Sequence, residues 1–151
     1  MKIYTLTNRQ HLPISREEAW NFLSSPAQLE NITSDNLSLQ PLAPLPLSMY
    51  EGMIIRYQLK PFLNIRMQWV TEITHIEEGN RFIDEQRFGP FRFWHHEHRL
   101  NESKHGIEIQ DTIHYVMPFS IFGRIVHRVY IRKMLEATFS YRKQQIEAYF
   151  S

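Results

Sequence analysis

A succession of short segments in which apolar and polar residues alternate, across residues 53–117, is the feature that most constrains the fold of this chain. Side chains in a strand point alternately to the two faces of a sheet, so this alternation predicts half-buried strands. Turn residues, such as Gly79 with Asn80 and Gly89 with Pro90, separate the segments. Connections this short join antiparallel neighbours, because parallel strands require long crossovers. The predicted strands cover residues 53–59, 65–73, 81–88, 91–100 and 107–117.

Helical signals flank this region on both sides. Residues 2–12 alternate like a further strand and end at Pro13, after which Ser15 and Glu18 have the spacing of a capping box. Ser25 followed by Pro26 indicates the start of a second short helix. After Pro118, apolar residues recur at helical spacing as far as residue 150 and predict one long helix with one buried face. The stripe consists of Ile121, Ile125, Val129, Leu135, Phe139 and Ile146, widened by Phe122, Val126 and Tyr130.

The order of these elements is strand, two short helices, about six strands and one long helix. It predicts an α+β fold in which a curved antiparallel sheet of about seven strands wraps around the C-terminal helix. The sequence contains no internal repeat and no second composition regime, so we expect a single domain over residues 1–151. A sheet curved around one helix leaves volume between the two layers, and we expect a cavity there.

Composition excludes several classes of protein. Apolar residues make up 42% of the chain and aromatic residues 13%, which is too much for a disordered protein. A formal net charge of +1 argues against a general polyanion binder, so we expect no nucleic-acid partner. The chain has no cysteine, which excludes disulfides and thiol chemistry. No apolar run is long enough to cross a membrane and residues 1–13 do not resemble a signal peptide, so we expect a cytoplasmic location.

Residues 93–100 carry an unusual density of histidine within a predicted strand. Alternation places Trp94, His96 and His98 on one face and His95 with charged residues on the other. Because the first set also contains Leu100, we expect it to face the core.

The next strand places polar side chains on the same apolar face. Asp111 and Tyr115 alternate with isoleucines there. If Asn101 pairs with Gly106 across a four-residue loop, His96 lies directly opposite Asp111. We therefore predict a histidine–aspartate pair inside the fold.

The preceding strand contributes Asp84 and Gln86 as further candidates. They share a face with each other, but a two-residue turn at Gly89 and Pro90 would point that face away from His96. Their inward placement therefore requires a bulge or a turn of odd length.

A set of motifs spread over the whole chain carries a family resemblance. They are residues 15–20 (SREEAW) with Phe22, residues 26–32, Asp84 with Gln86, residues 89–91, Trp94 with His96 and His98, Asp111 with Tyr115 and Pro118, Gly123, and Phe139 with Tyr141 and Arg142. With these motifs the chain resembles the SRPBCC superfamily, which has the helix-grip fold of START lipid-transfer domains, plant pollen-allergen-like carriers and polyketide cyclases. It is most similar to a bacterial branch labelled "cell-division inhibitor" or "cyclase/dehydrase-like". The resemblance implies a hydrophobic ligand cavity under the C-terminal helix.

Four uses of the polar cluster remain open at this point. A structural pair in which Asp111 satisfies His96 is one, and anchoring the polar head group of a ligand is another. General acid–base catalysis by His96 and Asp111 with Tyr115 is a third. Metal binding by two histidines and Asp111 is the fourth, on a weak signal. No nucleophile motif or cofactor loop accompanies the cluster, so we expect no cofactor and no metal, and catalysis is less favoured than binding.

We therefore predict a carrier or sensor of a small hydrophobic molecule such as a lipid, isoprenoid, quinone or polyketide. The alternatives are a cyclase or dehydratase on polyketide or aromatic substrates and a protein-interaction module linked to cell division. The sequence does not set the oligomeric state. The predicted ligand-binding residues are Trp69, Asp84, Gln86, Trp94, His96, His98, Asp111, Tyr115, Phe119, Phe122 and Val126.

Arginines recur every four residues on the predicted long helix, at Arg124, Arg128 and Arg132. Such a stripe is typical of the solvated face of an amphipathic helix. The alternative is contact with anionic phospholipid during ligand delivery, which we expect to be transient at most.

Overall fold

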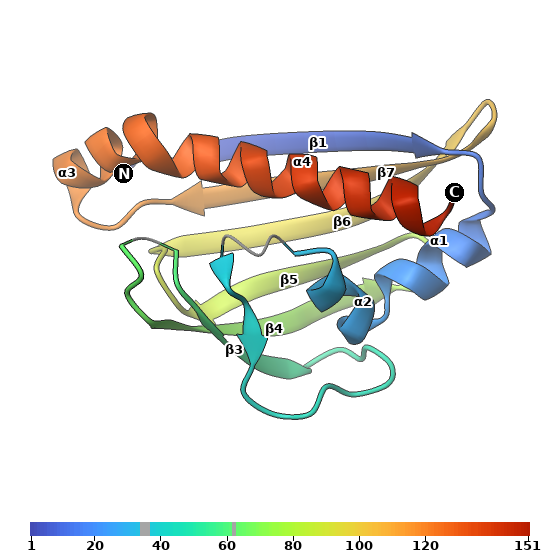
Figure 1. Cartoon of the computed structure of the whole chain (residues 1–151), viewed down its shortest axis with the longest axis horizontal. Helices are drawn as coiled ribbons and strands as arrows, with labels where there is room; N and C mark the ends of the chain where they lie inside the picture. Colours follow the sequence, from blue (N-terminus) through green and yellow to red (C-terminus); the bar gives the residue numbers. More distant parts are fainter. Residues whose placement is uncertain (34–36, 62) are drawn as a thin grey trace.

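The computed structural model describes residues 1–33, 37–61 and 63–151. One curved antiparallel sheet of seven strands, in the order β1-β7-β6-β5-β4-β3-β2, lies beside a long C-terminal helical segment (Figure 1). This is the predicted helix-grip architecture. The strands are β1 (Tyr4–Leu12), β2 (Gln40–Pro41), β3 (Ile54–Leu59), β4 (Met67–Glu77), β5 (Arg81–Phe88), β6 (Phe93–Ser103) and β7 (Gly106–Val116). The helices are α1 (Arg16–Leu23), α2 (Pro26–Asn31), α3 (Ser120–Val126), η2 (His127–Ile131) and α4 (Arg132–Tyr149).

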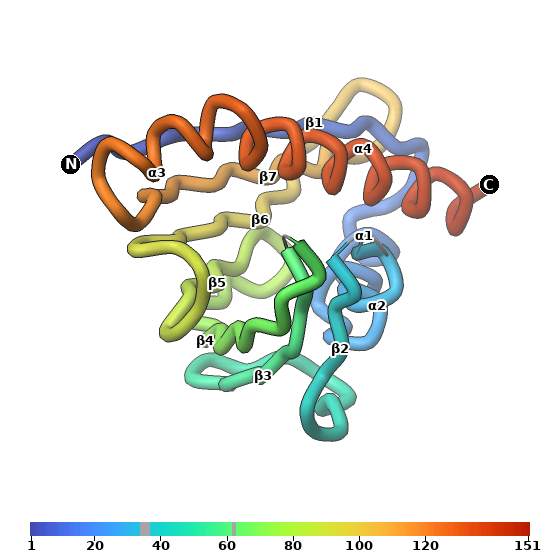
Figure 2. The backbone as a smooth tube through the Cα atoms, turned by 60° about the vertical axis from the view of Figure 1, so that its left-hand side comes forward, coloured from blue at the N-terminus to red at the C-terminus, as the bar shows by residue number. Residues whose placement is uncertain are grey.

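The sheet bends away from α4 at its β3 and β4 side, as Figure 2 shows. Two register shifts interrupt the pairing of β4 with β5, between Val70 and Thr71 and between Ile73 and His75. An extra residue in one strand of a pair bends that strand and increases its twist. The bulges in β4 therefore curve the part of the sheet that contains β3 and β4. This part and α2 together form a second wall of the interior.

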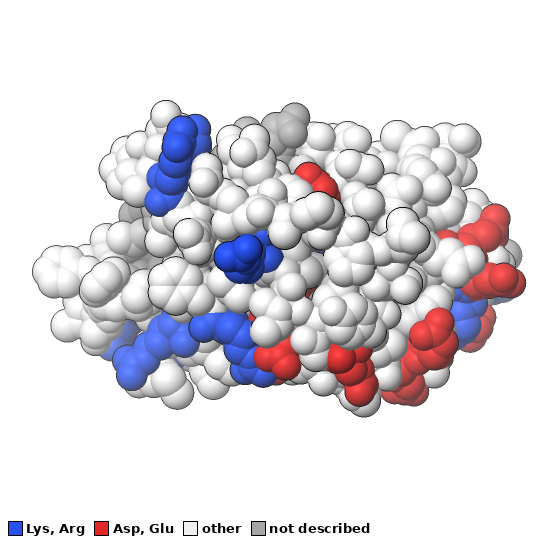
Figure 3. Space-filling model, turned by 90° about the horizontal axis from the view of Figure 1, so that it is seen from below, with Lys and Arg blue, Asp and Glu red and all other residues white. Residues whose placement is uncertain are grey.

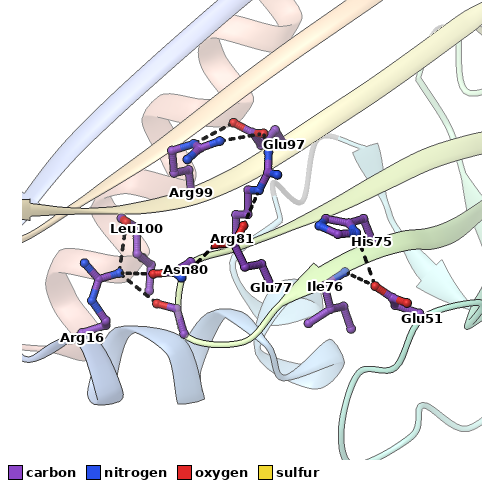
Figure 4. A network of polar contacts seen from close by, with 11 residues as sticks. Arg16, Glu51, His75, Ile76, Glu77, Asn80, Arg81, Glu97, Arg99 and Leu100 are labelled. Atoms are coloured by element: carbon purple, nitrogen blue, oxygen red, sulfur yellow. Dashed lines mark hydrogen bonds and ion pairs between the residues drawn. The ribbon is translucent and has the colours of Figure 1, made fainter.

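Both predicted N-terminal helices are present, and α1 begins at the predicted capping box. The Ser15 hydroxyl accepts a hydrogen bond from the Glu18 backbone N–H, and the Glu18 carboxylate accepts one from Ser15 N–H at 2.8 Å. Arg16 then ties this helix to the sheet (Figure 4). Its guanidinium donates to the carbonyl oxygens of Gly79 and Leu100, which lie in the β4–β5 turn and on β6. One side chain thus fixes α1 across the end of two strands.

The predicted register of the β6–β7 hairpin is wrong by two residues, although the predicted faces are right. Ser103 pairs with Gly106, so the loop has two residues instead of four, and Gly106 adopts a positive φ of 144°. As a result His98, not His96, lies opposite Asp111. A shift of two residues preserves which side chains point inward, because the side-chain period of a strand is two.

The connection between β5 and β6 resolves the placement of Asp84. This residue pairs with His96, so the register is centred on Pro90 and the connection has the odd-length character that inward placement requires. Gln86 serves the turn itself: its side-chain amide donates to the Phe91 carbonyl oxygen at 2.6 Å and its oxygen accepts from Phe91 N–H at 3.2 Å.

The C-terminal helical segment is long, as predicted, but its expected continuous apolar stripe is wrong for the first half. A π-helical turn, η2, separates α3 from α4. The buried positions before α4 are Gly123, His127 and Ile131. Ile121, Ile125 and Val129, which were expected in the buried stripe, are 65%, 56% and 65% exposed. Gly123, His127 and Ile131 are spaced four residues apart, so the buried face of this segment follows them and not the predicted stripe.

The proline-rich connector between α2 and β3 packs against the protein in part and is exposed in part. Pro41 belongs to β2, a two-residue edge strand, which is a position where the missing N–H is tolerated. Leu45 packs against the core, whereas Leu47 is 99% exposed. Within the described ranges, no helix combines the length and apolar character needed to cross a bilayer.

Candidate ligand-binding site

A cavity of about 200 Å³ lies between the curved sheet and the C-terminal helical segment. Its walls are mostly apolar and come from α2, the sheet strands and one face of α4. The volume is below the range of about 300–1,000 Å³ that is usual for drug-sized ligands, which favours one ring system or part of a chain. Apolar side chains that line it include Leu29, Ile55, Leu59, Trp69, Ile73, Phe82, Phe91, Trp94, Ile131, Met134, Leu135 and Phe139.

A compact polar cluster forms one part of this wall. His98 bridges two carboxylates, with Nε2 at 2.6 Å from Asp84 Oδ2 and Nδ1 at 3.1 Å from Asp111 Oδ1. His96 Nε2 lies 2.9 Å from the same Asp111 oxygen. The two imidazole rings stack with their centroids 3.7 Å apart. Both histidines and Asp111 are buried, so this cluster is held away from bulk water.

The surroundings shift the two histidines in opposite directions. Burial opposes the charged form of His98, but hydrogen bonds to Asp111 and Asp84 outweigh it and raise the pKa of His98 above its ordinary value. Burial and the neighbouring charge of His98 lower the pKa of His96. Burial acts to raise the pKa of Asp111, yet Arg142 and the hydrogen bonds from both histidines hold that pKa well below its ordinary value.

These directions describe an electrically balanced cluster. Two ionised carboxylates, Asp84 and Asp111, face one guanidinium on Arg142, so one further positive charge is needed. The raised pKa of His98 favours the proton there, and its ring nitrogens lie 2.6 Å from Asp84 Oδ2 and 3.1 Å from Asp111 Oδ1. The lowered pKa of His96 favours its neutral form, with Nε2 at 2.9 Å from Asp111 Oδ1 and Nδ1 at 3.6 Å from Asp84 Oδ2. Buried charges persist only when they are paired in this way.

Arg142 is the functional side chain that the sequence interpretation missed. It lines the cavity from α4, and its Nη2 lies 3.5 Å from Asp111 Oδ1. Its Nε is buried and has no hydrogen-bond partner among the described residues. The signal was present in the sequence: position 142 is three residues after Phe139 and four before Ile146, so it lies on the buried helix face.

Asp84, His96 and His98 also offer three donor atoms within 4.8 Å of one another, a spacing compatible with a metal ion. The ring geometry favours the hydrogen-bonded cluster instead. An imidazole binds a metal in its own ring plane, and stacked rings, here inclined by 29°, do not direct two nitrogen lone pairs at one ion. The Arg142 guanidinium beside Asp111 further disfavours a cation there.

The three predicted catalytic candidates do not form one cluster. His96 and Asp111 are in contact, but the Tyr115 hydroxyl is 2.7 Å from His127 Nε2 on η2. Burial raises the pKa of Tyr115 to about 12, and burial lowers the pKa of His127. This second pair is covered by Tyr4, whose ring stacks on His127 with a centroid distance of 3.6 Å. Catalysis by His96, Asp111 and Tyr115 stays a prediction, because the structure does not bring the three side chains together in one site.

The other predicted ligand-binding residues divide into two groups. Trp69, Asp84, Trp94, His96 and His98 line the cavity, and Asp111 lies directly behind the histidines. Gln86 and Tyr115 are not among the residues that line the cavity. The three helix residues that were expected to line or gate the site lie on the outer surface instead, because the buried face of the helix passes elsewhere. They are Phe119, Phe122 and Val126, with exposures of 81%, 76% and 41%.

Solved structures with the same architecture come from bacteria and plants. A protein of Thermus thermophilus superposes with a TM-score of 0.71 at 16% identity, covering 98% of this chain and 100% of its own. A Rhodobacter sphaeroides protein gives 0.65 at 16%, with coverage of 97% and 99%. Major latex-like protein 151 of Panax ginseng gives 0.71 at 13%, with coverage of 99% and 98%. No family model matches the chain, and no curated protein matches it in sequence.

Identities this low establish the fold alone. The chain therefore has the same helix-grip fold as the plant latex-like protein, and its membership of the SRPBCC superfamily stays a prediction. The more specific resemblance, to one bacterial branch of that superfamily, stays a prediction.

Proposed function

We propose that this protein binds a small hydrophobic molecule in the cavity beneath α4, as a carrier or a sensor. The observation that carries the proposal is an apolar chamber with one balanced polar cluster on its wall. Ligand sites typically combine mostly apolar walls with a few convergent polar groups. Transfer of the ligand's apolar surface out of water would supply the affinity, at about 25 cal/mol per Å² before ordering costs.

The polar cluster favours a ligand that carries an uncharged oxygen, best of all a hydroxyl group. His96 and Arg142 both line the cavity, so an imidazole and a guanidinium lie at the same wall. A hydroxyl group both donates and accepts, so it can pair with either of these groups. A carboxylate would add a negative charge to a cluster that is already balanced, which disfavours it. A ligand with a phenol-like or alcohol head group on an apolar body therefore fits best.

Native mass spectrometry of freshly purified protein tests the proposal, together with a variant that fills the cavity. Thr138 lines the cavity from α4, and Thr138→Phe adds a ring there. Thr138→Val is the matched control, because it keeps the shape of the side chain and adds no volume. We expect a bound organic molecule in one-to-one ratio in the wild type and in Thr138→Val, and its loss in Thr138→Phe.

Circular dichroism of both variants shows whether each keeps its fold. A folded Thr138→Phe protein that retains the same bound molecule would place the ligand elsewhere and contradict the proposal.

A further inference from the structure

The first half of the C-terminal helical segment presents apolar side chains to solvent. Phe119 and Phe122 are 81% and 76% exposed. Ile121, Ile125 and Val129 recur every four residues and so share one face, away from buried Gly123 and His127. An exposed apolar surface of this extent on a folded protein marks an interaction site.

The loop between β3 and β4 extends this surface. Leu63 is 90% exposed and Ile65 is 55% exposed. Tyr130 joins the two elements, because its hydroxyl donates to the Pro61 carbonyl oxygen at 2.8 Å. We call the combined surface the tip face. It consists of Phe119, Ile121, Phe122, Ile125, Val129, Leu63 and Ile65.

The charged residues in the segments around the tip face are basic, although Arg87 and Arg132 are paired with Glu72 and Glu136 just outside these segments. Residues 1–5, 59–68, 87–94 and 117–133 contain no Asp or Glu in the sequence. Figures 1 and 2 place α3 and the N-terminus at one end of the molecule, and Figure 3 shows Lys and Arg toward that end and Asp and Glu mostly toward the other. The basic residues of these segments are Lys2, Lys60, Arg66, Arg87, Arg92, Arg124, Arg128, Arg132 and Lys133.

An exposed apolar surface flanked by basic residues favours one kind of binding partner. A second copy of the chain docked face to face would bring two basic surfaces together, which is unfavourable. An anionic phospholipid surface matches both features, since it accepts apolar side chains at the acyl boundary and attracts lysine and arginine to its head groups. Arg124 and Arg128 are exposed beside the apolar residues of the same helix turns, where such contact places them at the head groups.

The tip face also adjoins the cavity. A surface depression formed by Val129, Tyr130, Lys133 and Ala137 shares the wall residues Pro61 and Met134 with the cavity. A ligand dissolved in a membrane would therefore meet this end of the protein first.

We propose that the tip face docks the protein reversibly on anionic phospholipid membranes. Docking requires both the exposed apolar side chains and the flanking arginines. It is independent of the identity of the cavity ligand, and it assigns a role to residues that the cavity does not use.

Vesicle flotation of the full chain tests this inference. We expect co-flotation with equimolar phosphatidylcholine and phosphatidylglycerol, weakened by added salt, and none with phosphatidylcholine alone. Phe119→Ser with Phe122→Ser should weaken partitioning about a hundredfold. The matched control is Leu47→Ser with Tyr50→Ser, which changes exposed apolar residues outside the tip face and should partition like the wild type.

The charge contribution is measured in the same assay. Arg124→Gln with Arg128→Gln should weaken partitioning about thirtyfold, since each basic residue near the surface contributes roughly a factor of five. Arg9→Gln with Lys104→Gln removes the same charge from other exposed positions and should have a much smaller effect. Equal partitioning of tip-face and control variants would overturn the inference. So would sedimentation showing a dimer that Phe119→Ser with Phe122→Ser abolishes, because the occupant would then be a second copy.

Discussion

The two parts of the C-terminal helical segment both carry apolar side chains but bury them to different extents. In α4, Leu135, Phe139 and Ile146 are buried against the sheet. In α3 and η2, most apolar side chains face solvent, and the buried positions are Gly123, His127 and Ile131. The difference teaches that burial depends on which face of a helix the underlying sheet meets, and not on apolar periodicity alone.

The comparison also separates two functions along one helix. Apolar side chains in α4 stabilise the fold and shape the cavity, because each buried side chain contributes about 2 kcal/mol. Those on α3 contribute little of this kind in the isolated protein. They are available for an external surface, which is the role that we infer for the tip face.

The largest expected effect contrasts one phenylalanine from each half. Phe139 is 7% exposed and its ring meets His96 edge-on at 5.9 Å, so Phe139→Ala should lower the free energy of unfolding by about 4 kcal/mol. Phe122→Ala removes an exposed ring and should change it by less than about 0.5 kcal/mol. Chemical denaturation measures both. Similar losses for the two variants would mean that α3 is packed like α4 and would remove the contrast.

The second-largest effect is expected from loss of the Asp111 carboxylate, which joins α4 to the sheet. Asp111→Asn leaves Arg142 without its nearest counter-charge and weakens the bridge to both histidines, so we expect a loss of about 3 kcal/mol in the free energy of unfolding. Glu17→Gln, at an exposed position on α1, is the control and should have little effect. A stability equal to the wild type would show that the buried charges are not coupled as described.

A smaller effect is expected from adding a methyl group at Gly123. A Cβ there would lie 2.0 Å from the Pro118 carbonyl oxygen, so α3 must move in Gly123→Ala. We expect a loss of about 2 kcal/mol, the usual cost of overpacking. Hydrogen exchange should show faster exchange in α3 while α4 keeps its protection. Ser140→Ala on the exposed face of α4 is the control, and faster exchange throughout α4 would contradict the separation of the two halves.

The smallest effect is a change of stability with pH, and it tests which histidine of the polar cluster carries the proton. Because the pKa of His98 is raised in the folded state, its contribution to stability is fully present below about pH 6.5 and is lost as the pH rises through the folded pKa. The lowered pKa of His96 acts in the opposite sense, since stability falls as the pH drops below about 6.5. Titration of the ring protons by NMR should show His98 titrating above His96. The reverse order would invert the assignment.

Much of the fold was predictable because its signals are local. Alternation identified the long strands, and Ser15 with Glu18 marked the start of α1. The inward face of β6 and β7 was also predictable, since parity survives a register error of two residues. The register itself was not, because it depends on the turn: Gly106 allows a two-residue loop that the sequence pattern did not distinguish from a longer one.

The site was predictable only in part, because its remaining members depend on tertiary contacts. Arg142 is brought to the histidines by the packing of α4: its spacing to Phe139 and Ile146 indicates the buried helix face, but the sequence does not indicate which strand residues this face meets. Phe119 and Phe122 were expected at the cavity but lie outside it, because Phe119 precedes α3 in the left-handed conformation and the buried position of α3 is Gly123. The placement of Asp84 depends on the length of the β5–β6 connection. Gly89 and Pro90 suggest a two-residue turn, whereas the observed pairing is centred on Pro90.

Titration with 2-naphthol, followed by isothermal titration calorimetry, tests the proposed site most directly. We predict saturable binding to the wild type and Thr138→Val, weaker binding of naphthalene, which lacks the hydroxyl group, and loss of 2-naphthol binding in a folded Thr138→Phe protein. Equal affinity for 2-naphthol in all three proteins, or equal affinity of the wild type for 2-naphthol and naphthalene, would contradict an apolar cavity with a polar anchor beneath α4.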